Sequence, residues 1–294
     1  MRKTTKSVIA AVAAVAVVAG AFAACSSNKN NAQGGSSSLG QITVISREEG
    51  SGTRDAFTEL AGIVDENKTD QTTDTAEITN STSVMMSTVS GNEKAIGYVS
   101  LGSLSDEVKA VSLNGVAPST ETVKDGSYLL QRPFNIAYID GSLSDVAKDF
   151  LSYIMSSQAA QIIDKEGYIS MDTTQSYTAA NMSGTVTLAG STSVAPLMNV
   201  LADEYEALNP NVKIEIQESG STAGIQSATE GAVDIAMSSR ALKDDELKTL
   251  KPQQIALDGI AVIVNKANQI DNITTDQIKQ IYTGEITAWD DVKQ

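Results

Sequence analysis

The sequence contains no histidine among its 294 residues. This absence excludes Ser-His-Asp and Cys-His nucleophilic sites and every metal site that histidine would ligate. Cys25 is the only cysteine, so the chain cannot form an intramolecular disulfide. Aromatic residues make up 4% of the chain, which argues against a carbohydrate site that stacks sugars on rings. The roughly 250 residues after Cys25 are enough to build a core without a disulfide.

Positive charge is also scarce. The chain has 21 Lys and Arg residues against 36 Asp and Glu residues, which gives a formal net charge of −15. A balance this acidic argues against nucleic acid or an anionic membrane surface as a partner. An anionic ligand would have to be captured by local hydrogen-bond geometry, against the field of the whole chain.

The N-terminal residues indicate export. A basic start with Arg2, Lys3 and Lys6 precedes an apolar run over residues 8–24 and small residues before Cys25. This pattern predicts a signal peptide over residues 1–24. An uncleaved membrane anchor is the alternative, although the run is slightly shorter than the ~20 residues that a span needs. With either outcome, the bulk of the chain lies outside the cell.

Cys25 is the candidate lipidation site. The sequence Phe22-Ala23-Ala24-Cys25 resembles a lipobox, whose cysteine is lipidated and becomes the mature N-terminus, although leucine is commoner where Phe22 stands. Residues 25–40 combine this cysteine with a Ser-, Asn- and Gly-rich stretch that predicts a flexible tether. The expected location is the extracellular face of the cell membrane, with attachment through the lipid on Cys25.

Strands and helices alternate along the remaining chain. Residues 194–208 carry apolar side chains on one helical face, and residues 212–216 alternate as a half-buried strand does. Thr274 and Gln277 match a capping box for a helix through Tyr282. The alternation predicts an α/β fold with a parallel sheet that helices cover on both faces. Further strands are expected at 42–46, 95–100, 133–138, 185–189, 233–237 and 254–265, further helices at 54–61, 146–164 and from Lys243, and a linker at 172–184.

Small hydroxyl residues and glycines fill four loops between a strand end and a helix start. In open α/β sheets, ligands bind at the carboxyl ends of the strands, where helix N-termini offer free N–H groups and positive dipole ends. Serine and threonine add uncharged donors, and glycine allows close backbone approach. Together these loops suit a small tetrahedral oxyanion, although any one of them is also an ordinary connection. They cover residues 47–53, 190–193, 220–224, and 233–234 together with 238–240.

The loop at residues 47–53 gives the strongest of these signals. It pairs Arg47 with a run of donors at a helix start, and a guanidinium can hold two oxyanion oxygens at once. A surface ion pair between Arg47 and Glu48 or Glu49 is the alternative role.

Six segments together closely resemble the phosphate-binding proteins of phosphate-specific ABC transporters. The resemblance covers nearly all of residues 42–292, and it implies a two-lobed periplasmic-binding-protein-like fold of type II that closes on phosphate at a hinge. It also implies delivery to the integral-membrane permease of an ABC importer by a monomer, without enzymatic activity, cofactor or metal. The segments are ISREEGSGTRDAF, AGSTSVAPLM, ESGSTAGI, VDIAMSSRALKDDE, IALDGIAVIVN and IYTGEITAWDDV.

The resemblance also suggests roles for individual residues. Thr192 and Ser193 correspond to the family's first anion-holding loop, and Ser221 to the second. Asp234 resembles the family's buried acceptor, for which capping of a helix or turn is the alternative role. The arginine and the helix-start donors correspond to Arg47, Ser51, Gly52 and Thr53.

The order of the segments departs from the family. The loop at residue 190 usually precedes the loop at residue 47, so the reversed order resembles a circular permutation. The break would fall between the C-terminus and residue 41, which places both ends in one lobe. Permutation is tolerated where the ends lie close together on the surface. The expected division is lobe A at residues 128–265, and a discontinuous lobe B at 41–127 plus 266–294.

Other ligands and classes of protein remain as alternatives. Sulfate or molybdate could replace phosphate, but the carboxylate of Asp234 would accept a hydrogen bond only from a protonated oxyanion and would repel sulfate. A secreted phosphatase-like enzyme would need a base for Ser51 or Ser221, and only lysine remains. A calcium loop at residues 65–70 lacks the glycine of an EF-hand, so a solvated loop is the preferred interpretation.

Overall fold

The computed structural model describes residues 40–293, so the predicted signal peptide, Cys25 and nearly all of the tether lie outside the described residues. Between residues 40 and 293, none of the helices combines the length and the apolar character that crossing a membrane requires. The strands are β1 (Thr43–Arg47), β2 (Glu77–Thr79), β3 (Ala95–Ser100), β4 (Lys109–Ala110), β5 (Ser112–Leu113), β6 (Gln131–Tyr138), β7 (Ile169–Ser170), β8 (Ser183–Gly190), β9 (Asn211–Glu218), β10 (Ile235–Ser238), β11 (Lys251–Val264) and β12 (Asn272–Ile273). The helices are α1 (Gly52–Leu60), α2 (Thr82–Ser90), α3 (Thr120–Lys124), α4 (Asp145–Ile154), α5 (Ser157–Lys165), α6 (Ala195–Leu208), α7 (Ser221–Thr229) and α8 (Thr275–Tyr282), and short 3-10 segments lie at Leu101–Ser103, Glu246–Lys248 and Trp289–Asp291.

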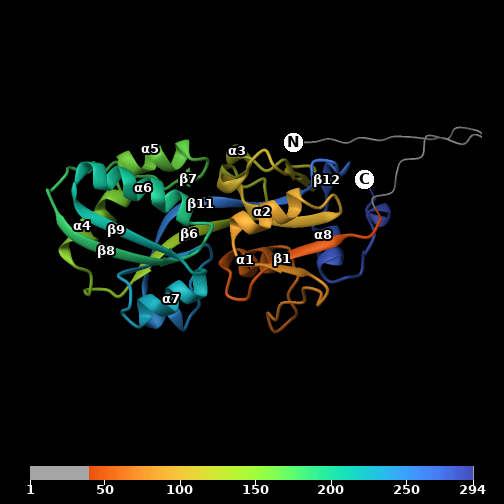
Figure 1. The fold of residues 1–294 in the computed structure, drawn as a ribbon, viewed down its shortest axis with the longest axis horizontal. Helices are drawn as coiled ribbons and strands as arrows, with labels where there is room; N and C mark the ends of the chain where they lie inside the picture. The colour runs from red at the N-terminus through yellow and green to blue at the C-terminus, as the bar shows by residue number, and fades with distance from the viewer. Residues whose placement is uncertain (1–39, 294) are drawn as a thin grey trace, which may run out of the picture. The chain divides into compact units, whose positions relative to one another are not determined.

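The main sheet is mixed, with the strand order β2-β1-β3-β11-β6-β10-β8-β9 (Figure 1). At one end β1 pairs in parallel with β2 and β3, and at the other end β8 pairs in parallel with β9 and β10. In the middle, β11 runs antiparallel to both β3 and β6. The predicted α/β class is confirmed, but the expectation of a parallel sheet was wrong. Hydrophobic periodicity indicates that a strand is buried, and it does not tell which way the strand runs.

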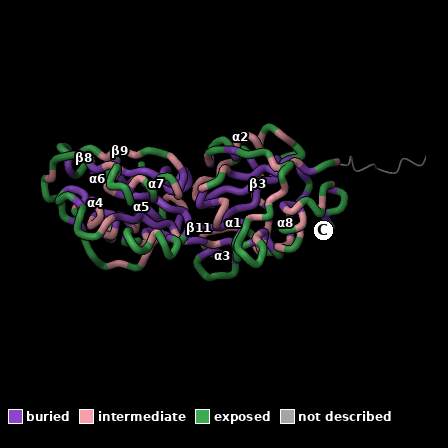
Figure 2. The backbone as a smooth tube through the Cα atoms, turned by 90° about the horizontal axis from the view of Figure 1, so that it is seen from below, coloured by how far each residue is buried: buried purple, intermediate pink, exposed green. Residues whose placement is uncertain are grey.

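The buried side chains form two large clusters, which we name the first core and the second core. The first core combines α1, α2 and α8 with β1, β3 and the end of β11. The second core combines α4, α5 and α6 with β6, β8 and the start of β11. Figure 2 shows the buried backbone of both cores in purple, with the exposed segments in green around it. A small third cluster lies under α7 and includes Ile225.

Strand β11 contributes to both large cores. Its residues Ile255 and Ala256 pack in the second core, whereas the run from Ile260 to Val264 packs in the first. Tyr128 and Leu130 also pack in the first core. The sequence placed residues 128–130 and 260–264 in the other lobe, so this packing differs from the expected lobe edges by a few residues. The hydrophobic pattern of β11 is continuous, and it gives no sign of where one core ends.

Two expected helices differ in the structure. The predicted helix over 146–164 is two helices, α4 and α5, because Ser156 caps the start of α5 by accepting a hydrogen bond from the N–H of Ala159. The helix expected from Lys243 is reduced to a short 3-10 segment. The capping box before α8 is confirmed: the N–H of Gln277 donates to Thr274 Oγ1 over 3.1 Å, and the N–H of Thr274 donates to Gln277 Oε1 over 2.9 Å.

The two ends of the described chain lie side by side. The N–H of Ile42 donates to the carbonyl of Thr287 over 2.8 Å, and the N–H of Trp289 donates to the carbonyl of Gly40 over 3.0 Å. Trp289 is buried in the first core. Both described ends of the chain therefore belong to the same core.

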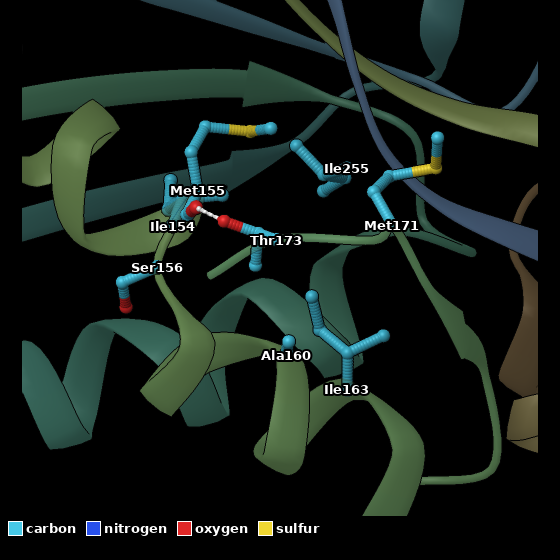
Figure 3. A pocket seen from close by; sticks show the side chains of 8 residues that line it. All are labelled: Ile154, Met155, Ser156, Ala160, Ile163, Met171, Thr173 and Ile255. Atoms are coloured by element: carbon cyan, nitrogen blue, oxygen red, sulfur yellow. Dashed lines mark hydrogen bonds between the residues drawn. The ribbon is translucent and has the colours of Figure 1, made fainter. Parts of the chain in front are cut away.

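The predicted linker at 172–184 runs without regular structure as far as β8, but it is held against the second core. Thr173 Oγ1 donates to the carbonyl of Met155 over 3.0 Å, and Figure 3 shows this bond at the edge of a small apolar crevice. Tyr177 OH donates to Asp149 Oδ2 over 2.6 Å. Tyr205 OH donates to the same oxygen over 2.7 Å. We call residues 172–182 the strap.

Candidate anion-binding site

The predicted donor loops come together between the two cores. The loop at residues 47–53 follows β1 in the first core, and the loops at 190–193 and 220–224 flank β8 and α7 of the opposite half. The N–H of Thr222 donates to the carbonyl of Gly50 over 3.1 Å, which ties two of these loops directly. The described residues 40–293 belong to one compact unit, so the loops meet inside a single body.

A group of buried hydroxyls forms the centre of the site. Thr53 Oγ1 and Ser193 Oγ share a hydrogen bond of 2.8 Å. Thr82 Oγ1 lies 3.0 Å from Ser193 Oγ and 3.3 Å from Thr192 Oγ1. All four side chains are buried. Because a hydroxyl can both donate and accept, these groups satisfy one another, and an anion would redirect their protons toward itself.

A second pair of hydroxyls comes from the start of α7 and the end of β10. The N–H of Ser239 donates to Ser221 Oγ over 3.2 Å, and the two hydroxyls lie 3.4 Å apart. Gly52 lies against this pair: a Cβ atom at that position would stand 2.4 Å from Ser221 Oγ and 2.8 Å from Ser239 Oγ. Only a glycine allows this approach of the first-core loop to the opposite half.

Four helices begin at this cluster. They are α1 at Gly52, α2 at Thr82, α6 at Ala195 and α7 at Ser221. The first N–H groups of a helix have no partner within it, and the N-terminus carries the positive end of the helix dipole. Four such ends produce a locally positive potential in a chain whose net charge is −15. The arrangement therefore favours a small anion against the field of the rest of the molecule.

Arg47 supplies the one full positive charge that contacts the hydroxyl group at Thr192. Its side chain is 2% exposed, and Nη2 donates to Thr192 Oγ1 over 3.0 Å. Its Nε and Nη2 also donate to Glu48 Oε2 and Oε1, both over 2.7 Å. The N–H of Arg47 donates to the hydroxyl of Tyr98, whose pKa burial raises to about 12. Glu48, which is 26% exposed, thus places a carboxylate beside the predicted anion position.

A second arginine connects the two halves at the edge of the site. Arg240 Nε lies 3.0 Å from Asp55 Oδ2 on α1, and its Nη2 donates to Thr222 Oγ1 over 3.2 Å. Its Nη1 and Nη2 donate to Glu246 Oε2 and Oε1, each over 2.8 Å. Burial raises the pKa of Asp55, although the positive charges of Arg240 and Lys243 oppose that shift. Because Asp55 and Arg240 come from opposite halves, their ion pair stabilises the arrangement in which the donor loops meet.

Asp234 is not part of the cluster, which corrects its predicted role. Its carboxylate accepts hydrogen bonds from the N–H and the Oγ1 of Thr187, each over 2.8 Å. The N–H of Asp234 in turn donates to the carbonyl of Thr187 over 3.0 Å. Asp234 precedes β10, whereas the cluster lies after the end of that strand at Ser238. The residue ties β8 to β10 at the opposite end from the site.

The other predicted residues are placed with the cluster. Ser51 caps α1 by accepting a hydrogen bond from the N–H of Arg54, so its hydroxyl holds the helix start. Sequence reasoning missed two contributors, Thr82 and Ser239. Ser239 lies in one of the four donor loops, but the composition of that loop does not distinguish it from its neighbours. Thr82 follows a Ser residue that caps a helix, a signal that was available at Ser81.

The acidic residues at 65–70, considered above as a calcium loop, have other roles in the structure. Asp65 Oδ1 accepts hydrogen bonds from the N–H groups of Asn67 and Thr69. Asp70 pairs with Arg54 over 2.6 Å and accepts hydrogen bonds from Thr72. These carboxylates shape a turn and support α1. Across residues 40–293, no group of three or more acidic or cysteine side chains is arranged to hold a metal ion.

A buried cluster of hydroxyls, helix N-termini and one arginine lies between the two cores, and this set of donors suits a small oxyanion. A family model described as the PBP superfamily domain matches residues 12–158 and 175–294. Phosphate-binding protein PstS 2 of Streptococcus agalactiae serotype V is 45% identical over 280 residues, which are 94% of each chain. A crystal structure of a phosphate-binding protein of a phosphate ABC transporter from Streptococcus pneumoniae matches with a TM-score of 0.70 and 46% identity, and covers 86% of this chain and 100% of that one.

The chain therefore belongs to the PBP superfamily and, within it, to the family of PstS phosphate-binding proteins. A further relative matches over a much shorter stretch. The PstS protein of Bacillus subtilis is 34% identical over 110 residues, which are 36% of this chain and 37% of that protein.

Proposed function

We propose that the chain binds inorganic phosphate outside the cell and delivers it to the integral-membrane permease of an ABC importer. The observation that carries this proposal is the meeting of four helix N-termini, a group of buried hydroxyls and Arg47 in one place. A tetrahedral oxyanion offers acceptors in several directions, and these hydroxyls are close enough to hydrogen-bond with one another. The names of the relatives support phosphate as the anion.

The proposed binding residues are those of the cluster. Arg47 and the starts of α1, α6 and α7 supply the donors, and Thr82 and Ser239 join the residues that the sequence indicated. Asp234 is left out. The full set is Arg47, Ser51, Gly52, Thr53, Thr82, Thr192, Ser193, Ser221 and Ser239.

The acceptor that would discriminate phosphate from sulfate is Glu48 in this proposal, and not Asp234. Its carboxylate is held by Arg47 beside Thr192. A carboxylate there can accept a hydrogen bond from a protonated phosphate, whereas sulfate carries no proton near neutral pH and is repelled. Another oxyanion, sulfate or molybdate, is the alternative ligand.

The experiment is a calorimetric titration of the chain from Ser26 onward with phosphate and then with sulfate. We expect one phosphate per chain and little heat with sulfate. Equal affinity for both anions would contradict the role of Glu48, and no binding of either would contradict the proposed function. Release of product from a chromogenic phosphate ester would favour the phosphatase-like alternative over a binding protein.

The remaining proposals concern attachment and architecture. We propose a signal peptide at residues 1–24, a lipid anchor on Cys25, a tether up to residue 40, and a monomer at the extracellular face of the membrane. The two cores support a two-lobed division in which residues 40–130 and 260–293 make up one lobe. Mass spectrometry of the membrane-bound protein would detect the lipid on Cys25, and an unmodified thiol there would contradict the anchor.

We also propose that the order of halves is circularly permuted relative to family members other than those, such as the Streptococcus agalactiae relative, that match along nearly the whole chain. The adjacent ends at Gly40 and Trp289 support this order, since a short connection could join them. The strap would then join positions that other members leave as chain ends.

A further inference from the structure

Two strands that connect the cores carry a buried ion pair. Arg132 on β6 lies directly opposite Asp258 on β11 in the antiparallel register. On one side of this pair, Ala256 packs in the second core, and on the other side, Ile260 packs in the first. The ion pair therefore marks the crossing between the two cores. Its side chains are only 1% and 0% exposed.

The pair is held by both halves of the molecule. Arg132 Nε and Nη2 donate to Asp258 Oδ2 over 3.1 and 3.0 Å. Ser100 Oγ, at the end of β3, donates to Asp258 Oδ1 over 2.9 Å. The Arg132 guanidinium also lies over the ring of Phe134, 5.2 Å from its centroid. Asp258 on β11 thus fixes the orientation of the guanidinium, and Ser100 on β3 in turn fixes the carboxylate of Asp258.

Burial of two charged side chains costs free energy of desolvation. A buried ion pair with no further role could therefore be replaced by apolar side chains. Burial raises the pKa of Asp258, although the positive charge of Arg132 opposes this shift. Burial likewise lowers the pKa of Arg132, although the negative charge of Asp258 opposes this shift.

The third nitrogen of the Arg132 guanidinium contacts a residue of the candidate anion site. Arg132 Nη1 donates to the carbonyl of Ser239 over 3.3 Å. The N–H of the same residue, Ser239, donates to Ser221 Oγ at the start of α7 over 3.2 Å. A continuous chain of hydrogen bonds therefore runs from Ser100 through Asp258, Arg132 and Ser239 to Ser221. It begins in the first core and ends at a donor of the candidate site.

We propose that Arg132 and Asp258 are positioning residues for anion binding. Asp258 orients the planar fork of Arg132, and Arg132 then holds the Ser239 turn so that Ser239 and Ser221 face the anion. Lysine could keep the charge, but it lacks the fork that binds Asp258 and Ser239 together. The inference rests on the proposed function, because it assigns these residues to the phosphate site.

The test compares two variants of the Arg132–Asp258 ion pair. In Arg132→Met/Asp258→Leu, both charges are replaced by apolar side chains of similar size, so we expect folding to be retained. In Arg132→Lys, the charge is kept and the fork is lost. For both variants we expect phosphate affinity in calorimetry to fall by about tenfold, as loss of well-directed hydrogen bonds predicts. Parent-like affinity in a folded double variant would overturn the proposal.

A matched control separates positioning from stability. Tyr205→Phe removes a partly buried hydrogen bond to Asp149 at the second core, away from the anion site. We expect it to lower the thermal midpoint without changing phosphate affinity. Loss of affinity in Tyr205→Phe comparable to that in Arg132→Lys would mean that stability alone explains the effect, and would also overturn the proposal.

Amide hydrogen exchange gives a measurement that does not depend on phosphate. In Arg132→Lys, the N–H of Ser239 should exchange faster than in the parent, while the backbone N–H of Val186 in β8 should not change. Unchanged exchange at Ser239 would overturn the positioning role, even if the double variant did not fold. Failure of the parent to bind phosphate would instead contradict the proposed function, and the exchange result would still report on the Ser239 turn.

Discussion

Gly52 lies so close to Ser221 that a Cβ atom on the glycine would stand 2.4 Å from the serine Oγ. Gly52 begins α1 and Ser221 begins α7, so this contact joins the two halves at their helix starts. The same Cβ atom would stand 2.8 Å from Ser239 Oγ. The contact therefore sets how closely the donors of one half can approach those of the other.

We predict that Gly52→Ala weakens phosphate binding. The added methyl group forces the two helix starts apart, and overpacking of this kind costs about 1–3 kcal/mol. Calorimetry on the parent and the variant measures the loss. Gly91→Ala is the matched control, because Gly91 has a φ of −84° at the end of α2 and a new Cβ there would meet its nearest atom at 3.3 Å. If Gly52→Ala bound phosphate with the affinity of the parent, the close approach of Gly52 to Ser221 would be contradicted.

Arg47→Ala should weaken phosphate binding more than any loss of a single hydroxyl. The change removes the charged donor beside Thr192, and hydrogen bonds to charged groups contribute about 1.5–3 kcal/mol each. The dissociation constant for phosphate is the quantity to measure. Lys68→Ala serves as the control, since Lys68 makes only an exposed ion pair with Glu59. If Arg47→Ala bound phosphate as the parent does, the site would have to lie elsewhere.

Glu48→Gln should narrow the difference between phosphate and sulfate affinity. The variant removes a negative charge next to Arg47, so sulfate is no longer repelled there. Competition of sulfate against bound phosphate measures the effect. Glu49→Gln controls for the loss of an exposed charge nearby.

Asp234→Asn should leave the selectivity between phosphate and sulfate unchanged. It should lower the free energy of unfolding by about 1 kcal/mol, because it weakens the hydrogen bonds from Thr187. A selectivity change in Asp234→Asn alone would restore the role that the sequence suggested.

A rearranged chain tests the permutation. It starts at Gly184, runs to Gln294, continues through a few Gly and Ser residues to Gln41, and ends at Asn181. The adjacent ends at Gly40 and Trp289 predict that this chain folds and binds phosphate, since each doubling of a flexible loop adds only about 0.6 kcal/mol. Residues 172–181 of the strap stay attached, so Tyr177 keeps its bond to Asp149.

Several linker lengths and light scattering complete that test. Soluble, folded, monomeric protein that binds phosphate is the expected result. Absence of folded protein at every length would count against the permuted order. A dimer of the parent chain in light scattering would instead indicate that two chains exchange halves.

Local sequence patterns predicted much of the fold and part of the site. The capping box at Thr274 fixed the start of α8, because it depends on residues three positions apart. The donor loops are predicted in the same way, since each is a short stretch rich in glycine and small hydroxyl residues between a strand end and a helix start. Arg47 and Ser193 are in the cluster for this reason.

Other features depend on contacts that no local pattern encodes. Thr82 meets Thr192 although 110 positions separate them, so its role depends on the assembled fold. Asp234 was misplaced because a Val-Asp pair before a strand does not reveal which end of the strand faces the ligand. The ion pair between Arg132 and Asp258 depends on the antiparallel register of β6 and β11, which periodicity cannot supply.

The central claim is that one anion site is formed by the starts of α1, α2, α6 and α7. A crystal structure of the chain from Ser26 onward, grown with phosphate, tests it most directly. We predict one phosphate within hydrogen-bond distance of Arg47 Nη2, Ser193, Ser221 and Ser239, with its oxygens replacing the hydroxyl contact between Thr53 and Ser193. Phosphate bound away from these four residues, or beside Asp234, would contradict the account.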